Sequence, residues 1–193
     1  MQGNGKCVII SAPSGAGKTT IVRSLLAKGL RLAFSVSATS RAKRGFEVDG
    51  QDYFFITAEE FKQRIGREEF VEWEEVYPGQ YYGTLRAEIE RIWSQGNCAI
   101  FDVDVVGGLH LKKIFGEQAL ALFVSPPSVA VLEHRLRSRG TETPESLKKR
   151  VDKAAHEMTF APEFDAIVVN DTLEHACEEA HERVKRFLDR ACE

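Results

Sequence analysis

The chain has 193 residues, 26 of them Lys or Arg and 29 Asp or Glu, so its charges nearly balance. This length fits one domain with a full hydrophobic core, and the charge balance argues against a broad nucleic-acid footprint. The sequence has no apolar run of membrane-spanning length, no signal-peptide core at its N-terminus and no metal-like spacing of its four cysteines. We therefore expect a reduced, cytoplasmic, soluble protein with no nucleic-acid or membrane partner, and leave its oligomeric state open.

The first predicted element is a strand over Lys6–Ser11, which leads through a glycine-rich turn into a helix. The turn, Ser11-Ala-Pro-Ser-Gly-Ala-Gly-Lys-Thr-Thr20, nearly matches the phosphate-binding pattern GxxxxGK followed by Ser or Thr, with Ala12 in place of the first glycine. A plain strand–helix turn would leave the adjacent lysine and hydroxyl unexplained. Backbone N–H groups and the helix dipole suit phosphate, Lys18 suits the β and γ phosphates of ATP, and Thr19 suits Mg²⁺. The expected ATP-binding residues are Ala12, Pro13, Ser14, Gly15, Ala16, Gly17, Lys18, Thr19 and Thr20.

Short apolar runs then alternate with helical periods, which is typical of an α/β fold with a parallel sheet covered by helices. Because these runs are continuous rather than alternating, we expect strands covered on both faces. The further predicted strands are Cys98–Val103, Ala119–Ser125 and Ala166–Asn170, with Cys7 and Cys98 as small core residues. Helical stripes begin near Leu85, Val129 and Leu173.

The segment from about Phe34 to Tyr82 has a different character and predicts a small α+β insert. It combines one brief helix after Thr57 with short β-type pieces at Phe34–Ser37, Tyr53–Ile56 and Phe70–Tyr77. A second polar stretch, Ser138–Pro144, interrupts the helical pattern and predicts a short lid. We therefore expect a single domain over 1–193, with a core of 1–33 and 96–193, an insert of about 34–95 and a lid of about 137–150.

Arginines cluster on the two segments that could close over the phosphate-binding turn. One cluster contains Arg41 and Arg44, and the other contains Arg135, Arg139 and Arg150. A single surface arginine is usually a solvated charge, but planar guanidinium groups also suit the oxygens of a transferring phosphoryl group. We favour that second interpretation because both clusters lie on such segments.

Two aspartates, Asp102 and Asp104, come at and just after the end of a predicted strand. The carboxyl ends of parallel strands form the ligand crevice, so Asp102 could hold Mg²⁺ or orient an arginine. A helix N-cap is the alternative, and it accounts for one aspartate but hardly for both.

Glu72, taken alone, fits a solvent-facing position on a strand. Together with Ser37, Tyr53, Tyr82 and Thr84 it suggests a base-binding site, because a carboxylate can accept hydrogen bonds from N1–H and the exocyclic amine of guanine. Adenine offers an acceptor at N1 and no amine beside it, so such a site would discriminate strongly between the two bases.

These motifs, taken jointly, resemble those of guanylate kinase, in order from about Lys6 to Asp171. The segments that carry the resemblance are Phe34-Ser-Val-Ser37-Ala-Thr-Ser-Arg41-Ala-Lys-Arg44, Glu47-Val-Asp-Gly50-Gln-Asp-Tyr53, Phe70-Val-Glu72-Trp73, Tyr81-Tyr82-Gly83-Thr84, Asp102-Val-Asp104 and Arg139-Gly-Thr-Glu-Thr143. The resemblance implies a P-loop kinase of core, insert and lid, which transfers the γ-phosphoryl group of ATP to GMP or dGMP with Mg²⁺ in purine nucleotide metabolism. Lys43 and Val106 depart from the residues usual in the family.

The resemblance also implies a role for each matching residue. The guanine base would be bound by Ser37, Glu72, Thr84 and Asp104, and the GMP phosphate by Arg41, Arg44, Tyr53 and Tyr82. The catalytic residues would be Lys18, Arg135, Arg139 and Arg150. Thr19 and Asp102 would bind the metal, with Asp102 also at the substrate phosphates. Asn170 would lie near the adenosine end of ATP.

Three other functions remain to be weighed against this one. A kinase for another nucleoside monophosphate would use the same turn, and a coupled assay over five acceptors separates it. A non-catalytic guanylate-kinase-like module would keep the insert and lose the ATP turn, which is present here. An RNA-binding protein finds little support in the balanced charge.

Overall fold

The protein is described by a computed structural model that covers residues 5–138 and 144–190. Its core is a five-stranded parallel sheet in which β1 lies at the centre. In sheet order the strands are β2 (Leu32–Phe34), β7 (Cys98–Val103), β1 (Cys7–Ser11), β8 (Ala119–Ser125) and β9 (Ala166–Val169). The continuous apolar sequence of β1 follows from its position, since all five of its residues are buried.

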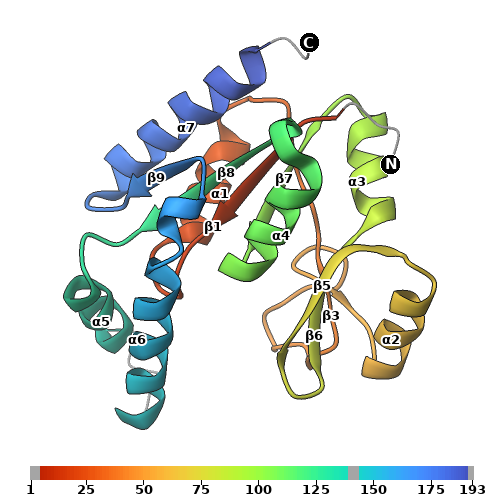
Figure 1. Cartoon of the computed structure of the whole chain (residues 1–193), viewed down its shortest axis with the longest axis horizontal. Coiled ribbons are helices and arrows are strands. Elements are labelled where there is room, and N and C mark those ends of the chain that lie inside the picture. The colour runs from red at the N-terminus through yellow and green to blue at the C-terminus, as the bar shows by residue number, and fades with distance from the viewer. Residues whose placement is uncertain (1–4, 139–143, 191–193) are drawn as a thin grey trace.

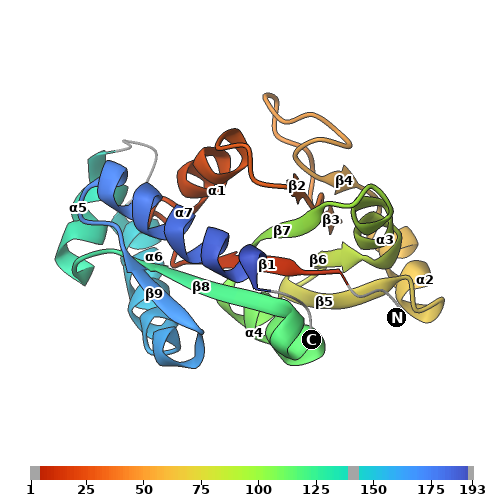
Figure 2. The same ribbon diagram turned by 90° about the horizontal axis from the view of Figure 1, so that it is seen from above.

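Helices cover both faces of this sheet (Figure 2). Alternate side chains of β1 belong to two hydrophobic clusters, one on each face. Val8 and Ile10 pack with α1 (Lys18–Ala27) and α7 (Leu173–Asp189). Cys7 and Ile9 pack on the opposite face with α3 (Arg86–Ser94) and α4 (Val105–Phe115). The remaining helices are α5 (Val129–Ser138), α6 (Pro144–Met158) and the single turns η1 (Gly116–Gln118) and η2 (Ala161–Glu163). Figure 1 shows α5 and α6 extending together from the core.

A second, four-stranded sheet forms the insert, which we define as residues 35–85 (Figure 1). Its strands in sheet order are β4 (Phe54–Phe55), β3 (Ala38–Thr39), β6 (Gln80–Leu85) and β5 (Phe70–Tyr77), and its helix is α2 (Ala58–Gly66). The insert has a small hydrophobic core of its own, in which the fully buried Phe61 of α2 stacks on Phe70 at 4.3 Å between ring centroids. Thr57 caps α2 by accepting a hydrogen bond from the Glu60 N–H.

The predicted parallel sheet and its four strands are confirmed, with ends shifted by at most one residue. Phe34, however, pairs with Ile100 in the core sheet, so the expectation that an insert strand begins there is wrong. The helix over Arg86–Ser94 packs its Ile89 and Ile92 against the core sheet. The insert therefore ends at residue 85 and not at about residue 95. The sheet that Phe34 joins is thus decided by pairing with a strand that is distant in the sequence, and not by the local sequence.

Helix α4 and strand β6 were not predicted. The expectation that the core strands are covered on both faces is wrong for β9. This strand lies at the edge of the sheet, and its Ile167 and Val169 are 39% and 42% exposed. The predicted lid falls partly on residues 139–143, which lie outside the described residues. Within the described ranges, no helix has both the length and the apolarity to cross a membrane.

The insert core predicts a stability difference between two phenylalanines. Replacing Phe61 by Ala should lower the free energy of unfolding by about 3–5 kcal/mol, because the change leaves a cavity in a tightly packed cluster. Phe46→Ala is the matched control, since Phe46 is 81% exposed, and its cost should stay below about 0.5 kcal/mol. Urea unfolding measures both, and equal losses would contradict a separate core in the insert.

Candidate active site

The turn between β1 and α1 depends on two glycines in the left-handed region, Gly15 at φ 97° and Gly17 at φ 98°. A Cβ on Gly17 would lie 2.4 Å from the Asn170 side-chain nitrogen, and one on Gly15 would lie 2.8 Å from Leu136. Ala12, by contrast, is buried in the core, so its methyl group is accommodated. The turn therefore tolerates the one departure from the phosphate-binding pattern.

The lysine and hydroxyl of this turn converge on the end of β7. The Lys18 ammonium lies 2.7 Å from Asp102 Oδ1 and donates a hydrogen bond of 2.6 Å to the Val103 carbonyl. The Thr19 hydroxyl donates to Asp102 Oδ2 at 3.0 Å. A hydroxyl and a carboxylate side by side are hard oxygen donors that suit Mg²⁺. Among the described residues, no group of three or more His, Cys, Asp or Glu that could hold a metal ion is found.

Asp104 has a different position from Asp102. Its Oδ1 accepts a hydrogen bond of 2.8 Å from the Gly107 N–H and so caps the N-terminus of α4. Its backbone carbonyl accepts another from the Ser11 hydroxyl at 3.0 Å. The N-cap alternative therefore holds for Asp104, while Asp102 faces the phosphate-binding turn.

The predicted base-binding residues come together between the insert and α4. The Thr84 hydroxyl donates to Glu72 Oε1 at 2.6 Å across the β5–β6 pair. A Cβ on Gly107 would lie 3.3 Å from both Glu72 Oε2 and Asp104 Oδ1, so the glycine lets these carboxylates approach one helix end. Ser37 immediately precedes β3, and continuing the β3–β6 register by one residue places it beside Thr84.

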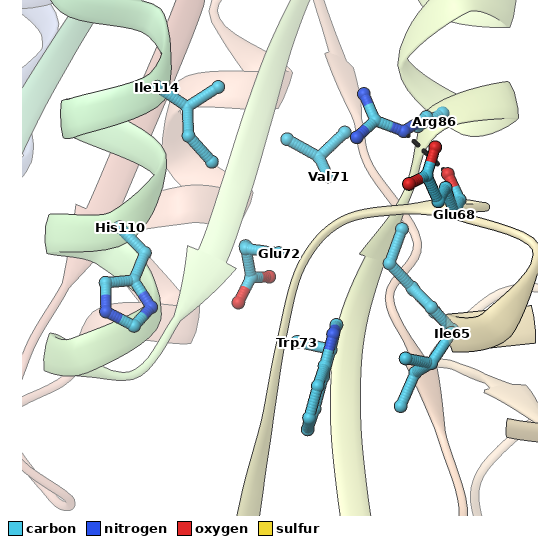
Figure 3. A pocket seen from close by; sticks show the side chains of 9 residues that line it. Ile65, Glu68, Val71, Glu72, Trp73, Arg86, His110 and Ile114 are labelled. Carbon is cyan, nitrogen blue, oxygen red and sulfur yellow. Dashed lines mark hydrogen bonds between the residues drawn. The ribbon is translucent and has the colours of Figure 1, made fainter. Parts of the chain in front are cut away.

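The solvent-facing interpretation of Glu72 is wrong. Figure 3 shows Glu72 and His110 on the two sides of the gap between β5 and α4, where a pocket of about 430 Å³ opens. Burial raises the pKa of Glu72 to about 7, the charges of Asp104 and Glu74 add to the rise, and the Thr84 hydrogen bonds oppose it. Within the described part of the chain Glu72 has no ion pair, and a carboxyl group in this state is suited to hydrogen-bond donors from a ligand.

Arg41 lies in an aromatic frame on the insert. Its Nε donates to the Tyr82 hydroxyl at 3.1 Å, and its guanidinium lies 5.0 Å from the centroid of the Tyr53 ring. The rings of Tyr53 and Tyr82 meet edge to face at 6.0 Å. Three of the four residues predicted to bind the acceptor phosphate are thus in mutual contact.

Glu47 is a further residue of this group, to which the sequence analysis gave no role. The Arg41 guanidinium donates to both of its carboxylate oxygens, and the backbone N–H of Arg44 donates to Glu47 Oε2 at 2.8 Å. These bonds hold the pKa of Glu47 near 2 despite burial, so it is charged at neutral pH. The spacing Arg-x-x-Arg-x-x-Glu was the sequence signal that could have pointed to it.

The remaining predicted residues lie around the phosphate-binding turn, apart from Arg139, which is outside the described residues. Arg150 of α6 donates to the Ser14 hydroxyl, and Arg135 of α5 donates to the Asn170 carbonyl at 2.9 Å. The buried Asn170 side chain donates to the Ala16 carbonyl at 2.7 Å and so supports the turn.

Figure 1 shows the insert on one side of the molecule and the helices α5 and α6 on the other. Burial, and next the negative charge of Asp102, raise the pKa of Tyr53 on the insert.

A sequence model described as guanylate kinase matches residues 4–189 of the chain. The chain belongs to the guanylate kinase family. It is 53% identical to the guanylate kinase of Bacteroides thetaiotaomicron over 98% of this chain and 93% of that protein. It is 50% identical to the guanylate kinase of Porphyromonas gingivalis over 95% of this chain and 98% of that protein. The crystal structure of guanylate kinase from Anaplasma phagocytophilum matches with a TM-score of 0.78 at 26% identity, covering 97% of this chain and 88% of that one. The resemblance and the fold class inferred from sequence are confirmed.

The raised pKa of Glu72 predicts a pH dependence of stability. Glu72 binds its proton more tightly in the folded protein, with a pKa of about 7, than at the ordinary value of 4.5, so its contribution to stability falls as pH rises through this window. The Glu72→Gln variant cannot ionise there, and its stability relative to wild type should rise between about pH 5 and about pH 7 and then level off.

Urea unfolding over this pH range measures the difference. Glu90→Gln, at an exposed position of α3, is the control and should keep a constant difference from wild type. A pH-independent difference for Glu72→Gln would contradict the burial of an ionisable carboxyl group.

Proposed function

We propose that this chain transfers the γ-phosphoryl group of ATP to GMP or dGMP, yielding ADP and the nucleoside diphosphate. The observation that carries the proposal is the pairing of two sites in one chain. A lysine-containing phosphate turn tied to Asp102 lies on the core, and a carboxylate pocket at Glu72 lies on the facing insert. The family membership agrees with this reaction.

The guanine base would be recognised at Glu72 by its hydrogen-bonding edge, on the side where Thr84 and Asp104 lie near this carboxyl group. Ionised Glu72 would accept hydrogen bonds from N1–H and the exocyclic amine, with Asp104 beside it and the hydroxyls of Thr84 and Ser37 at the edge. Because Glu72 is largely removed from water, a base that presents an acceptor to the ionised carboxylate would leave buried groups unpaired.

The acceptor phosphate would bind the insert through Arg41, Arg44, Tyr53 and Tyr82. Glu47 holds the Arg41 guanidinium in one orientation before the phosphate arrives, which lowers the entropic cost of binding. The same carboxylate holds the backbone of Arg44, so both arginines depend on it.

ATP would bind the turn over residues 12–20 with its β and γ phosphates at Lys18. Arg150 of α6 bonds to Ser14 of this turn, and Arg135 of α5 bonds to the carbonyl of Asn170, whose side chain supports the turn. Both arginines could neutralise charge that develops on the transferring group. Thr19 and Asp102 would hold Mg²⁺, which would supply positive charge against the β and γ phosphates.

The reaction needs no covalent intermediate with the protein. An oxygen of the GMP phosphate forms a bond to the γ-phosphorus while the bond from that phosphorus to the β–γ bridging oxygen breaks, and the electron pair leaves with ADP. The chain's part is alignment, charge stabilisation and exclusion of water, which would otherwise accept the phosphoryl group.

Lys18→Ala should reduce kcat at least about a hundredfold, because the charge that stabilises the transferring group is lost while the turn keeps its glycines. Lys28→Ala is the matched control, since Lys28 is exposed at the other end of the same helix and pairs with Glu178. Activity of Lys18→Ala within about tenfold of wild type, or about 1.4 kcal/mol of barrier, would contradict the role of the turn.

A coupled assay over GMP, AMP, UMP, CMP and dTMP tests the acceptor. The wild-type protein should prefer GMP. The Glu72→Gln variant should have a KM for GMP at least about tenfold higher and a smaller preference for GMP over AMP, because an amide offers one acceptor oxygen instead of two. Glu75→Gln, on the exposed side of the same strand, should leave both unchanged.

Two results would count against the proposal in different ways. A wild-type preference for another nucleotide would overturn the reaction itself. Unaltered selectivity in Glu72→Gln would instead remove Glu72 from the base pocket.

A further inference from the structure

The chain crosses between the core and the insert twice. The first crossing, residues 35–37, leads from β2 of the core sheet to β3 of the insert sheet. The second crossing is the junction of Leu85 and Arg86, where β6 ends and α3 begins. Ser37 is the last residue of the first crossing, and Thr84 directly precedes the second crossing.

One side chain joins the two crossings. The Oε1 atom of Glu88, in the first turn of α3, accepts a hydrogen bond from the backbone N–H of Val36 at 3.2 Å, across 52 residues of sequence. The guanidinium of Arg91 donates to the same carboxylate through Nη2 at 2.8 Å and through Nε at 2.9 Å. Glu88 is only 6% exposed, whereas the Arg91 side chain is 48% exposed.

The ordinary role of an acidic residue in a first helical turn does not explain this arrangement. Such a residue interacts with the helix dipole and with a basic residue three positions on, and both interactions are available to an exposed side chain. Burying the carboxylate costs free energy that needs hydrogen bonds in return. Burial raises its pKa, but the bonds from Arg91 and Val36 outweigh this and hold the pKa of Glu88 below its ordinary value.

Val36 lies at the point where neither sheet holds the chain. The residue before it belongs to the core, because the Ser35 N–H donates to the Ile100 carbonyl at 3.0 Å. The residue after it belongs to the insert, because the Ser37 carbonyl accepts from the Phe54 N–H at 2.9 Å. Ser35 adds no side-chain anchor, since its buried hydroxyl has no hydrogen-bond partner in the described structure.

Helix α3 is fixed to both parts of the molecule. Its Ile89 and Ile92 pack in the core, while Leu85, its N-cap, belongs to the hydrophobic cluster of the insert. The hydrogen bond between Val36 and this helix therefore fixes the position of the first crossing relative to the second.

We propose that Glu88 is a positioning residue that locks the two crossings together and thereby holds Ser37 and Thr84 in register for the guanine base. The inference rests on the proposed base site. Without the carboxylate, the Val36 N–H would be buried and unpaired, and the crossing would be free to shift the Ser37 hydroxyl away from its neighbours.

The test compares Glu88→Ala with Glu60→Ala. Glu60 also pairs with an arginine of its own helix, Arg64, within the insert, but its side chain contacts neither crossing in the described structure. Glu88→Ala should raise the KM for GMP about tenfold, equivalent to about 1.4 kcal/mol, and leave the KM for ATP within about twofold. Glu60→Ala should leave both constants within about twofold, and Glu88→Gln, which keeps an acceptor for Val36, should restore the KM for GMP to within about threefold.

A merely structural role would lower stability without separating the two substrates. Equal increases of both KM values in Glu88→Ala, or an unchanged KM for GMP, would overturn the proposal. If Glu88→Ala fails to fold, Arg91→Ala carries the test, because it loosens the carboxylate while Val36 keeps its acceptor, and it too should raise the KM for GMP alone.

Amide hydrogen exchange separates failure of this inference from failure of the proposed reaction. The Val36 amide should exchange at least about tenfold faster in unliganded Glu88→Ala than in wild type, whereas the Phe54 amide should not. Unchanged exchange at Val36 would overturn the lock even if the protein phosphorylates GMP. Faster exchange in a protein that does not use GMP would count against the reaction and not against the lock.

Discussion

The parallel pairing of β1 with β7 is the constraint on which the site depends. The register places Asp102 opposite Ile10 and Val103 opposite Ser11, so a carboxylate and a carbonyl stand beside the turn that follows β1. Lys18 and Thr19 at the start of α1 both bond to these groups. A shift of the strands by one residue would turn Asp102 to the other face of the sheet and leave the lysine without its partner.

In the described structure, the two sites differ in how their charges are balanced. The cations expected to bind phosphate already have carboxylate partners, Asp102 for Lys18 and Glu47 for Arg41. Glu72 is in the opposite state, because it lies near other carboxylates and Thr84 supplies the hydrogen-bond donors described for it. In the proposed reaction, a phosphate would meet cations that are already oriented, while the base would supply further donors to Glu72.

The local motifs were readable from sequence, whereas the long-range contacts were not. The phosphate-binding turn is a contiguous pattern, and an inner strand such as β1 appears as an apolar run because both of its faces are buried. Helix α4 was missed because Gly107 and Gly108 at its start have low helix propensity. The structure supplies the tertiary reason for both, since a side chain at Gly108 would meet the Ser11 hydroxyl at 2.2 Å and one at Gly107 would approach Glu72. Glu88 resembles any first-turn acid until its distant partner, Val36, is known.

The gap between insert and core also collects acidic groups from several elements. The pKa of Glu74 on β5 and that of Glu157 on α6 are raised, in both cases by burial first and by the charge of Asp104 as well. Lys153 of α6 opposes this charge, since it lies 3.6 Å from Glu157 and 5.9 Å from the centroid of the Tyr77 ring on β5. Mutual repulsion of these carboxylates disfavours a further anionic group in this gap. The guanine edge proposed for Glu72 would bring two hydrogen-bond donors and no negative charge, whereas an acidic ligand would add to the repulsion. The surplus of carboxylates would therefore favour a ligand edge that donates hydrogen bonds.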